Sequence, residues 1–292
     1  MNKLSCLFTV FLYINVRMKL TFAFSPCPND TFMFEPMVNA RIDLLGFDFA
    51  YVLDDVENLN KSAILGLHDI TKLSFNAYTR LSDIYQLLTS GSALGNNCGP
   101  LLISKRPIDD VPIEKLKIAV PGFNTTAYLL LKYAFPNLEH VQELLFSDIE
   151  NAVANGKVDA GVIIHENRFT YSNKGLHKII DLGEYWENKT NSPIPLGGIA
   201  VKRSLPEEVK QKLNYILFQS IKFAFENPTS GIDFIKSNAQ EMDENVMFSH
   251  INLYVNNYSK DLGDDGKNAI NVLFKTVYPN FTDQDLKDLF VR

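Results

Sequence analysis

The sequence predicts an α/β protein built as two lobes. Short apolar segments alternate with segments of helical periodicity through the first two thirds of the chain. Two similar segments, 99–106 (GPLLISKR) and 197–204 (GGIAVKRS), each begin with glycine and join an apolar strand to a basic pair. They bracket a middle region, so the chain would leave one lobe, build a second and return by two crossing strands, with a ligand cleft between the lobes. A single sheet without a hinge remains the alternative.

Nine segments have the composition of strands, and several are apolar throughout, which is typical of strands covered on both faces. They are Leu20–Phe24, Phe47–Leu53, Asp69–Leu73, Leu101–Ser104, Lys117–Val120, Leu144–Phe146, Ala160–Ile164, Lys178–Asp181 and Ile199–Lys202. Capping residues predict three intervening helices: Asp54 or Asp55 to Leu65, Asn124 or Thr125 to Phe135, and Ser147 or Asp148 to Asn155.

Helices dominate the last third of the chain, where proline and glycine separate five of them. Their predicted ranges are 206–226, 228–239, 244–258, 263–278 and 283–290. The domain organisation that follows is a large discontinuous domain of residues 18–102 and 199–292 with a small domain of residues 103–198 inserted in it.

Residues 1–17 form an extra segment with a short uncharged stretch. It is too short to span a membrane, and no small-residue cleavage site follows it. It is either a leader or the product of an upstream start codon, and the strand-like MKLTFAF that begins at Met18 favours the second interpretation.

Composition excludes several classes of function. The chain has 28 basic and 34 acidic residues and no Lys/Arg-rich run, which argues against nucleic acid as a partner. Three scattered cysteines without a C-x-x-C pair argue against a disulfide framework or a zinc knuckle and favour a cytoplasmic location. Neither a G-x-G-x-x-G turn nor a G-x-S-x-G elbow is present, so no cofactor is expected and a serine hydrolase is not indicated.

Three loops place polar groups where a strand gives way to a helix. In SPCPNDTF (25–32), two prolines stiffen the backbone, and Asn29 or Asp30 can cap the next helix. Ser74 follows a strand in TKLSFNA (71–77), and Thr125 and Thr126 open a helix in VPGFNTTAYLLL (120–131). Each could bind a carboxylate at a helix N-terminus, or serve only as a turn or a cap.

His165 is the most distinctive single residue. It follows the apolar strand DAGVII and should face a crevice, where an imidazole can act as a general base near neutral pH. A structural role is the competing interpretation. HENRF does not match H-E-x-x-H, so no metal site is expected, and the other four histidines are expected in polar, helix-edge or loop positions.

In combination and order, SPCPNDTF, LDDVENLNKSA, DITKLSFNAY, GSALGNNCGP, VPGFNTTAYLLLK and GVIIHENRFTY resemble the 1,4-dihydroxy-6-naphthoate synthases of the futalosine route to menaquinone. The resemblance covers most of residues 18–203 and implies a type II periplasmic-binding-protein-like fold. It implies a carbon–carbon lyase, acting without cofactor or metal on cyclic dehypoxanthine futalosine, a small carboxylate. His165 would be the proton acceptor, and the substrate-binding residues would be Lys72, Leu73, Ser74, Thr125, Thr126 and Ala127, with Asn29 and Asp30 bordering the same cleft.

Two other functions share this fold. One is a solute-binding protein for a small carboxylate, which a true leader at residues 1–17 would favour and His165 disfavours. The other is the related chorismate dehydratase, which the SPCPNDTF and I-I-H-E motifs disfavour. The sequence does not indicate the oligomeric state.

Overall fold

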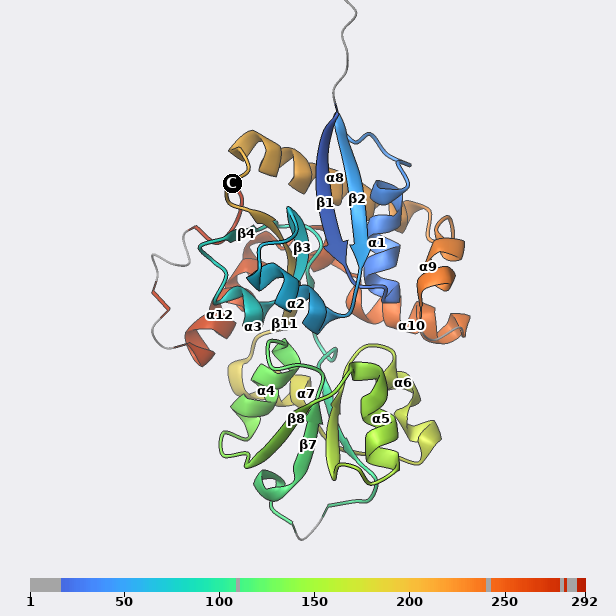
Figure 1. Cartoon of the computed structure of the whole chain (residues 1–292), viewed down its shortest axis with the longest axis vertical. Helices are drawn as coiled ribbons and strands as arrows, with labels where there is room; N and C mark the ends of the chain where they lie inside the picture. The colour runs from blue at the N-terminus through green and yellow to red at the C-terminus, as the bar shows by residue number, and fades with distance from the viewer. Residues whose placement is uncertain (1–16, 109–110, 240–242, 279–280, 283–287) are drawn as a thin grey trace, which may run out of the picture.

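A computed structural model of the chain describes residues 17–108, 111–239, 243–278, 281–282 and 288–292. Two separate β-sheets, each flanked by helices, form an upper and a lower lobe in Figure 1. We call them the first and the second lobe. The α/β fold with two lobes agrees with the sequence prediction. The question of a leader falls almost entirely on residues outside the described part of the chain.

The first lobe is built on a sheet whose strand order is β2-β1-β3-β11-β4, with β5 also pairing with β11. β1 is parallel to β2 and β3, whereas β11 runs antiparallel to its three partners. The parallel strands therefore end at one edge, and that edge faces the second lobe. The bounds are β1 Met18–Phe24, β2 Phe47–Leu53, β3 Ile70–Ser74, β4 Tyr85–Leu87, β5 Ala93–Gly95 and β11 Ile194–Lys202.

The second lobe has a sheet of order β10-β6-β9-β7-β8. β7 is parallel to β8 and β9, and β6 is antiparallel to β9 and β10. The bounds are β6 Leu101–Ser104, β7 Lys117–Val120, β8 His140–Glu143, β9 Ala160–Ile163 and β10 His177–Asp181.

The chain crosses between the lobes twice, through residues 96–100 and residues 191–193. Gly99 and Gly183 meet at the first crossing, where a Cβ on Gly99 would lie 2.2 Å from the Cα of Gly183. Only glycine permits so close an approach of two backbones. We propose that the domain boundaries lie at these crossings, a few residues before those expected from the sequence, because Leu101 already pairs in the second sheet and Ile194 in the first.

Helices cover both faces of each sheet. In the first lobe α1 packs against α8, α9 and α10, and every residue from Pro28 to Met37 is buried, so this helix lies inside the lobe. Pro36 lies near the end of α1 and the helix stops at Val38. The helix bounds are α1 Pro28–Val38, α2 Val56–Ile64, α3 Phe75–Tyr78, α4 Thr126–Ala134, α5 Phe146–Ala154, α6 Asn167–Thr170, α7 Leu182–Thr190, α8 Glu207–Glu226, α9 Ile232–Asn238, α10 Glu244–Tyr254, α11 Asn257–Lys260 and α12 Gly263–Val277, with 3₁₀ turns at Ile113–Lys115 and Tyr171–Lys174.

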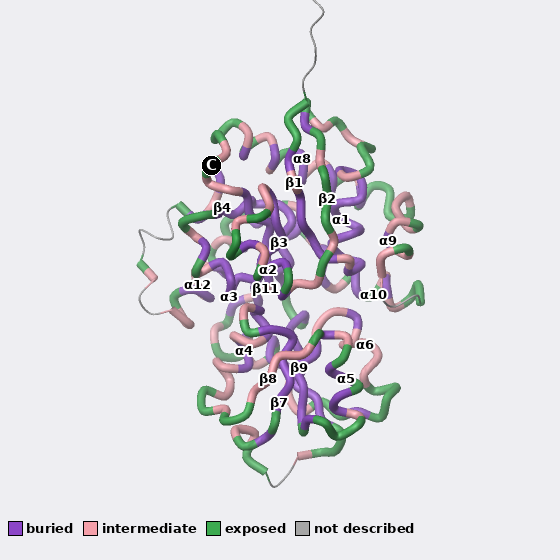
Figure 2. The backbone as a smooth tube through the Cα atoms, viewed as in Figure 1, coloured by how far each residue is buried: buried purple, intermediate pink, exposed green. Residues whose placement is uncertain are grey.

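Burial follows the sheets and the helix faces that cover them (Figure 2). One apolar cluster lies between the first sheet and the α1, α8 and α10 layer, and another lies between the second sheet and α5. The largest cluster runs from the first lobe into the second, from Phe274 and Tyr78 to Val120 and Trp186. This cluster adds buried apolar surface to the contact between the two lobes. No helix in the described ranges is long and apolar enough to cross a membrane.

Three predictions of strand and helix positions after residue 140 were wrong. Leu144–Phe146 is no strand, because the strand lies earlier at β8 and Phe146 already begins α5. Leu145, rather than Ser147 or Asp148, is the N-cap residue of α5. The helix expected over 244–258 stops at Tyr254, where Asn256 caps the separate short helix α11. Most of the helix expected over 283–290 lies outside the described residues.

Candidate active site

A pocket lies between the lobes, where β1 and β3 of the first sheet and β7 and β9 of the second sheet end. This is the edge at which open α/β sheets usually bind ligands. The pocket contains about 670 Å³ of space including its open mouth. All nine residues singled out in the sequence line it: Asn29, Asp30, Lys72, Leu73, Ser74, Thr125, Thr126, Ala127 and His165.

A buried ion pair crosses the floor of the pocket within the first lobe. Lys72 Nζ lies 2.7 Å from Asp30 Oδ1, and the Asp30 side chain is fully buried. Asp30 also accepts hydrogen bonds from the Ser25 hydroxyl at 2.9 Å and the Asn29 amide at 2.8 Å. The prediction that Asn29 or Asp30 caps α1 was wrong, because Cys27 is the N-cap residue and Asp30 bonds to other side chains. Asn29 Oδ1 is left buried without a partner among the described residues, so it can accept a hydrogen bond from a ligand.

Ser74 ends β3 and presents its hydroxyl to the pocket. Two hydrogen bonds to Asn60 fix Ser74 in position. The Asn60 amide donates to Ser74 Oγ at 3.0 Å, and the Ser74 backbone N–H donates to Asn60 Oδ1 at 3.0 Å. The hydroxyl does not cap α3. Since Oγ already accepts a hydrogen bond, its own proton is free to be donated to an acceptor in the pocket.

The N-terminus of α4 points at the pocket from the second lobe. The Thr125 side chain caps the helix by accepting from the Tyr128 N–H at 3.2 Å, as the sequence predicts. Thr126 Oγ1 donates to the Leu196 carbonyl at 2.6 Å and so joins α4 to β11 of the first lobe. The first-turn N–H groups of such a helix lack intrahelical partners, and with the helix dipole they favour an anion.

His165 follows β9 and lies on the second-lobe side of the pocket, with a backbone φ of +57°. That left-handed conformation is uncommon for residues other than glycine and is often found at functional positions. Phe146 packs edge-on against the imidazole, with ring centroids 5.1 Å apart. Burial lowers the pKa of His165 to about 4, so the imidazole is neutral near pH 7. Nε2 is buried and has no hydrogen-bond partner within the described ranges.

His250 is the residue that the sequence analysis missed. It was expected in a polar position, but it is completely buried in α10, with its ring centroid 6.0 Å from that of His165 and 4.6 Å from that of Tyr254. Burial, reinforced by His165 and Lys72, lowers its pKa well below the ordinary value. Neither ring nitrogen has a partner among the residues described. The packing of α10 against α1 and β5 brings it there, and no sequence motif marks it.

Possible metal donors also meet at this place. One donor atom from each of Cys27, His165 and Glu166 lies within 4.8 Å of the others. Their spacing in the sequence matches no metal-binding motif, because Cys27 comes from the loop before α1 and the other two follow β9.

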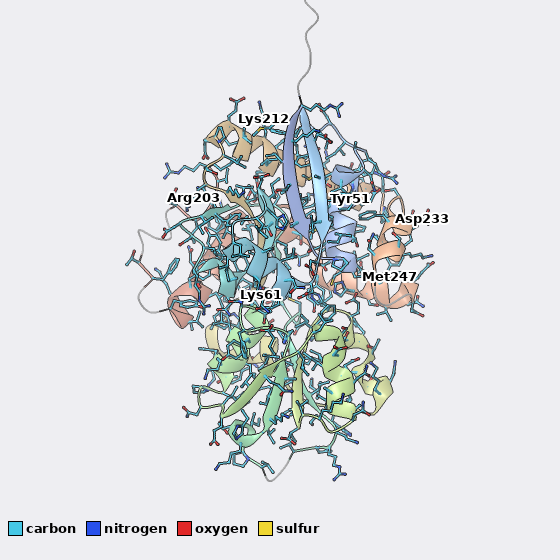
Figure 3. All side chains as sticks on the ribbon, in the orientation of Figure 1. Tyr51, Lys61, Arg203, Lys212, Asp233 and Met247 are labelled. Atoms are coloured by element: carbon cyan, nitrogen blue, oxygen red, sulfur yellow. The ribbon has the colours of Figure 1, made fainter. Side chains whose placement is uncertain are left out.

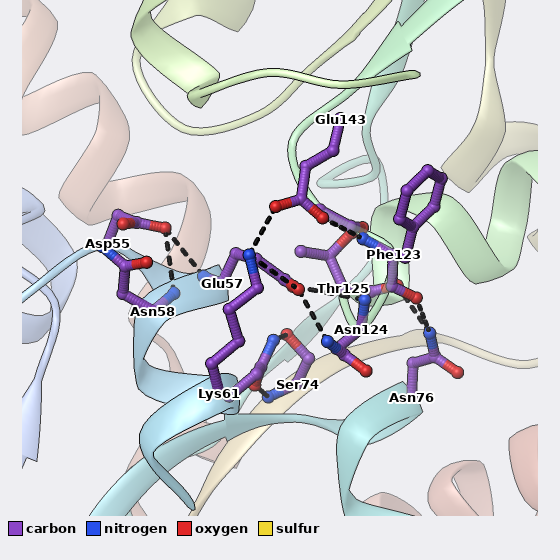
Figure 4. Close-up of polar contacts among 12 residues, drawn as sticks. Asp55, Glu57, Asn58, Lys61, Ser74, Asn76, Phe123, Asn124, Thr125 and Glu143 are labelled. Carbon is purple, nitrogen blue, oxygen red and sulfur yellow. Dashed lines mark hydrogen bonds and ion pairs between the residues drawn. The ribbon is translucent and has the colours of Figure 1, made fainter. Parts of the chain in front are cut away.

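Polar contacts hold the two lobes together beside the pocket (Figure 4). The buried Glu57 carboxylate on α2 accepts hydrogen bonds from the Asn124 amide at 2.6 Å and the Asn124 backbone N–H at 3.2 Å. Lys61, on the same helix, pairs with Glu143 at the end of β8 at 2.5 Å, and Figure 3 shows Lys61 beside the junction of the lobes. Asn76 donates to the Phe123 and Thr125 carbonyl groups, each at 3.1 Å.

The family model described as menaquinone biosynthesis matches residues 20–279. This chain belongs to that family. Its sequence is 41% identical to a 1,4-dihydroxy-6-naphtoate synthase from Thermus thermophilus over 87% of this chain and 92% of that one. It is 40% identical to the protein of the same name from Streptomyces coelicolor, over 86% of this chain and 90% of that one. The chain is therefore an enzyme of menaquinone biosynthesis, as the sequence resemblance implied.

Solved structures confirm the fold. A protein from Archaeoglobus fulgidus superposes with a TM-score of 0.85 at 32% identity, covering 91% of this chain and 98% of that one. The ligand-binding component of an ABC-type import system from Staphylococcus aureus superposes with a TM-score of 0.66 over 94% of this chain and 97% of that one. At 12% identity the second likeness concerns the fold alone. A Candida albicans protein described as having the generic periplasmic binding protein fold also superposes, with a TM-score of 0.65 over 94% of this chain and 97% of that one, so this chain has that fold.

Proposed function

We propose that this enzyme converts cyclic dehypoxanthine futalosine to 1,4-dihydroxy-6-naphthoate and that His165 is its general base. The observation that carries the proposal is the neutral His165 imidazole beside the pocket, with a ring nitrogen that no described residue engages. The relatives from Thermus and Streptomyces carry the name of this activity and support the same reaction.

The substrate carboxylate would bind where positive potential and donors converge. The first turn of α4 at Thr126 and Ala127 approaches from one lobe, and the Ser74 hydroxyl and the Lys72 ammonium approach from the other. Asn29 Oδ1 would accept a hydrogen bond from a substrate hydroxyl. Because Leu73 and Ala127 add buried apolar surface, the rest of the substrate would be held away from water.

His165 would start the reaction by accepting a carbon-bound proton. The electron pair of the broken C–H bond forms the new double bond as the leaving fragment departs, and the imidazolium can return its proton to that fragment. Burial makes the imidazolium costly and so lowers the pKa of His165; the Asp30 carboxylate opposes that shift in part, and the Lys72 ammonium adds to it. Enclosure between the lobes keeps water from the intermediate.

The test is turnover of cyclic dehypoxanthine futalosine by the chain expressed from Met18, with product detected by mass spectrometry. We expect His165→Ala to lower the rate by roughly 10²- to 10⁴-fold. His177→Ala is the matched control, because His177 is exposed at the start of β10 and does not line the pocket, and it should keep the rate of the unmodified enzyme.

Near-normal turnover by His165→Ala would show that His165 is not the base. Tight binding of the substrate by the unmodified chain without any product would favour a solute-binding protein instead. A cytoplasmic location belongs to the same proposal, and the free, buried thiols of Cys27 and Cys98 are consistent with it.

A further inference from the structure

Three donors of different chemistry meet beside the proposed base. The Cys27 sulfur comes from the first lobe, and a ring nitrogen of His165 and a carboxylate oxygen of Glu166 come from the second, all within 4.8 Å of one another. We propose that Cys27, His165 and Glu166 form a zinc-binding site that ties the two lobes together and inhibits the enzyme when it is occupied.

The donor set suits zinc. Thiolate, imidazole and carboxylate are the protein ligands of Zn²⁺, at bond lengths of about 2.0 to 2.3 Å. A tetrahedral ion with such bonds holds its ligand atoms roughly 3.5 Å apart, so these donors need to approach by about 1 Å. Side-chain rotation supplies a movement of that size. Three protein ligands leave the fourth position to water.

Cys27 has rigid and buried surroundings. Cys27 lies between Pro26 and Pro28, whose fixed φ angles hold its backbone before a metal arrives. Cys27 and Glu166 are each only 4% exposed. The Asp30 carboxylate is paired with the Lys72 ammonium, while burial and the Glu166 carboxylate raise the pKa of the Cys27 thiol. A bound dication would act in the opposite direction and favour the thiolate.

Zinc binding would block the chemistry without any redox step. The thiol proton leaves to solvent as the sulfur–zinc bond forms, and the bonded imidazole nitrogen donates its lone pair to the metal. An imidazole bound in that way cannot accept a proton from substrate. This inhibitory half of the inference depends on the function proposed for His165, whereas the metal site itself depends only on the donors.

Cobalt substitution tests the site directly. Co²⁺ is added to the full chain in a Cys6→Ser background, and the thiolate-to-cobalt charge-transfer absorption is followed in the near ultraviolet. We expect one equivalent to give the band and Zn²⁺ to remove it. Cys27→Ser should abolish the band. Cys98→Ser, which changes the other buried free cysteine, a residue that lines the pocket, should keep it. Glu166→Gln should weaken Zn²⁺ binding at least 10-fold and provides a second variant if Cys27→Ser does not fold.

A band that survives Cys27→Ser, or one that Cys98→Ser removes, would overturn the site. Turnover is then measured with Zn²⁺, and Cys27→Ser should be at least 10-fold less sensitive to it than the unmodified enzyme. If Zn²⁺ binds through Cys27 and turnover is unchanged, the zinc site stands but the inhibition is refuted. That result would also count against the function proposed for His165.

Discussion

Asn124→Ala should raise the KM for substrate by roughly 10- to 100-fold and leave kcat nearly unchanged. Asn124 reaches from the second lobe to the Glu57 carboxylate of the first, with its amide at 2.6 Å. Glu57 is 3% exposed, and its nearest ion-pair partner, Lys61, is 3.8 Å away. Burial raises the pKa of Glu57, and the Asn124 hydrogen bond opposes that shift.

The expected change in KM follows from the hydrogen bond between Asn124 and Glu57. A hydrogen bond to a buried charged group contributes about 1.5 to 3 kcal/mol, and each 1.4 kcal/mol changes an equilibrium tenfold. The substitution destabilises the closed form, in which the lobes are in contact, because Asn124 and Glu57 lie in different lobes and their hydrogen bond requires that contact. If substrate binds that arrangement alone, its apparent affinity falls with the population of the closed form, while the closed complex reacts as before.

The assay is steady-state kinetics with a matched asparagine as control. Asn58 also bonds to a carboxylate, Asp54 at 2.9 Å, but both residues lie in the first lobe, so Asn58→Ala should change KM by less than about twofold. A fall in kcat at constant KM for Asn124→Ala would refute the argument, since it would mean that Asn124 acts on the chemical step. Equal effects of the two variants would refute it as well.

Three other predictions concern stability. Gly99→Ala should lower the free energy of unfolding by about 1 to 3 kcal/mol or prevent folding, because the added Cβ would collide with the Gly183 backbone. Thermal unfolding measures the change, and an unchanged Tm would contradict the prediction. His250→Leu should leave the free energy of unfolding unchanged or raise it, because it removes two buried nitrogens that have no hydrogen-bond partner in the described ranges. A decrease of more than about 2 kcal/mol would show that the imidazole makes stabilising hydrogen bonds, and it would contradict the prediction. Burial alone would raise the pKa of Asp69, but hydrogen bonds from Thr21 and the Lys202 ammonium at 3.3 Å lower that pKa below 3.8. The ionised Asp69 therefore stabilises the fold above pH 3.8, and this stabilisation is lost as the pH falls through the lowered pKa. Asp69→Asn should therefore weaken the acid dependence of unfolding, and an unchanged acid limb would count against the assignment.

The sequence predicts most of this fold because local chemistry marks the elements. The apolar strands at Leu101–Ser104 and Lys117–Val120 are mostly buried and agree with the structure residue for residue. β8 is the instructive exception, because its sequence HVQE is polar and half exposed at the edge of a sheet, whereas the more apolar LLF just after it leads into a helix. Hydrophobicity indicates burial, and an edge strand is only partly buried.

The sequence predicts some residues of the pocket and misses others. Ser74, Thr125 and His165 each follow a strand, so the sequence places them at sheet edges that the fold then brings together. His250 could not be found by such reasoning, because it lies mid-helix more than 80 residues after His165 and only tertiary packing joins the two. Asp30 was predicted as a cap from its residue type and position, but its carboxylate pairs with the buried Lys72 of β3 instead.

The strand order also determines when each lobe can be completed during synthesis. All strands of the second sheet lie within residues 101–181, so that sheet can pair as soon as those residues have left the ribosome. The first sheet has to wait for β11, which inserts between β3 and β4, and for the final residues, where the Leu87 N–H donates to the Leu289 carbonyl. The lobe that begins the chain is therefore finished last, and a nascent chain would carry a folded second lobe beside an unclosed first sheet.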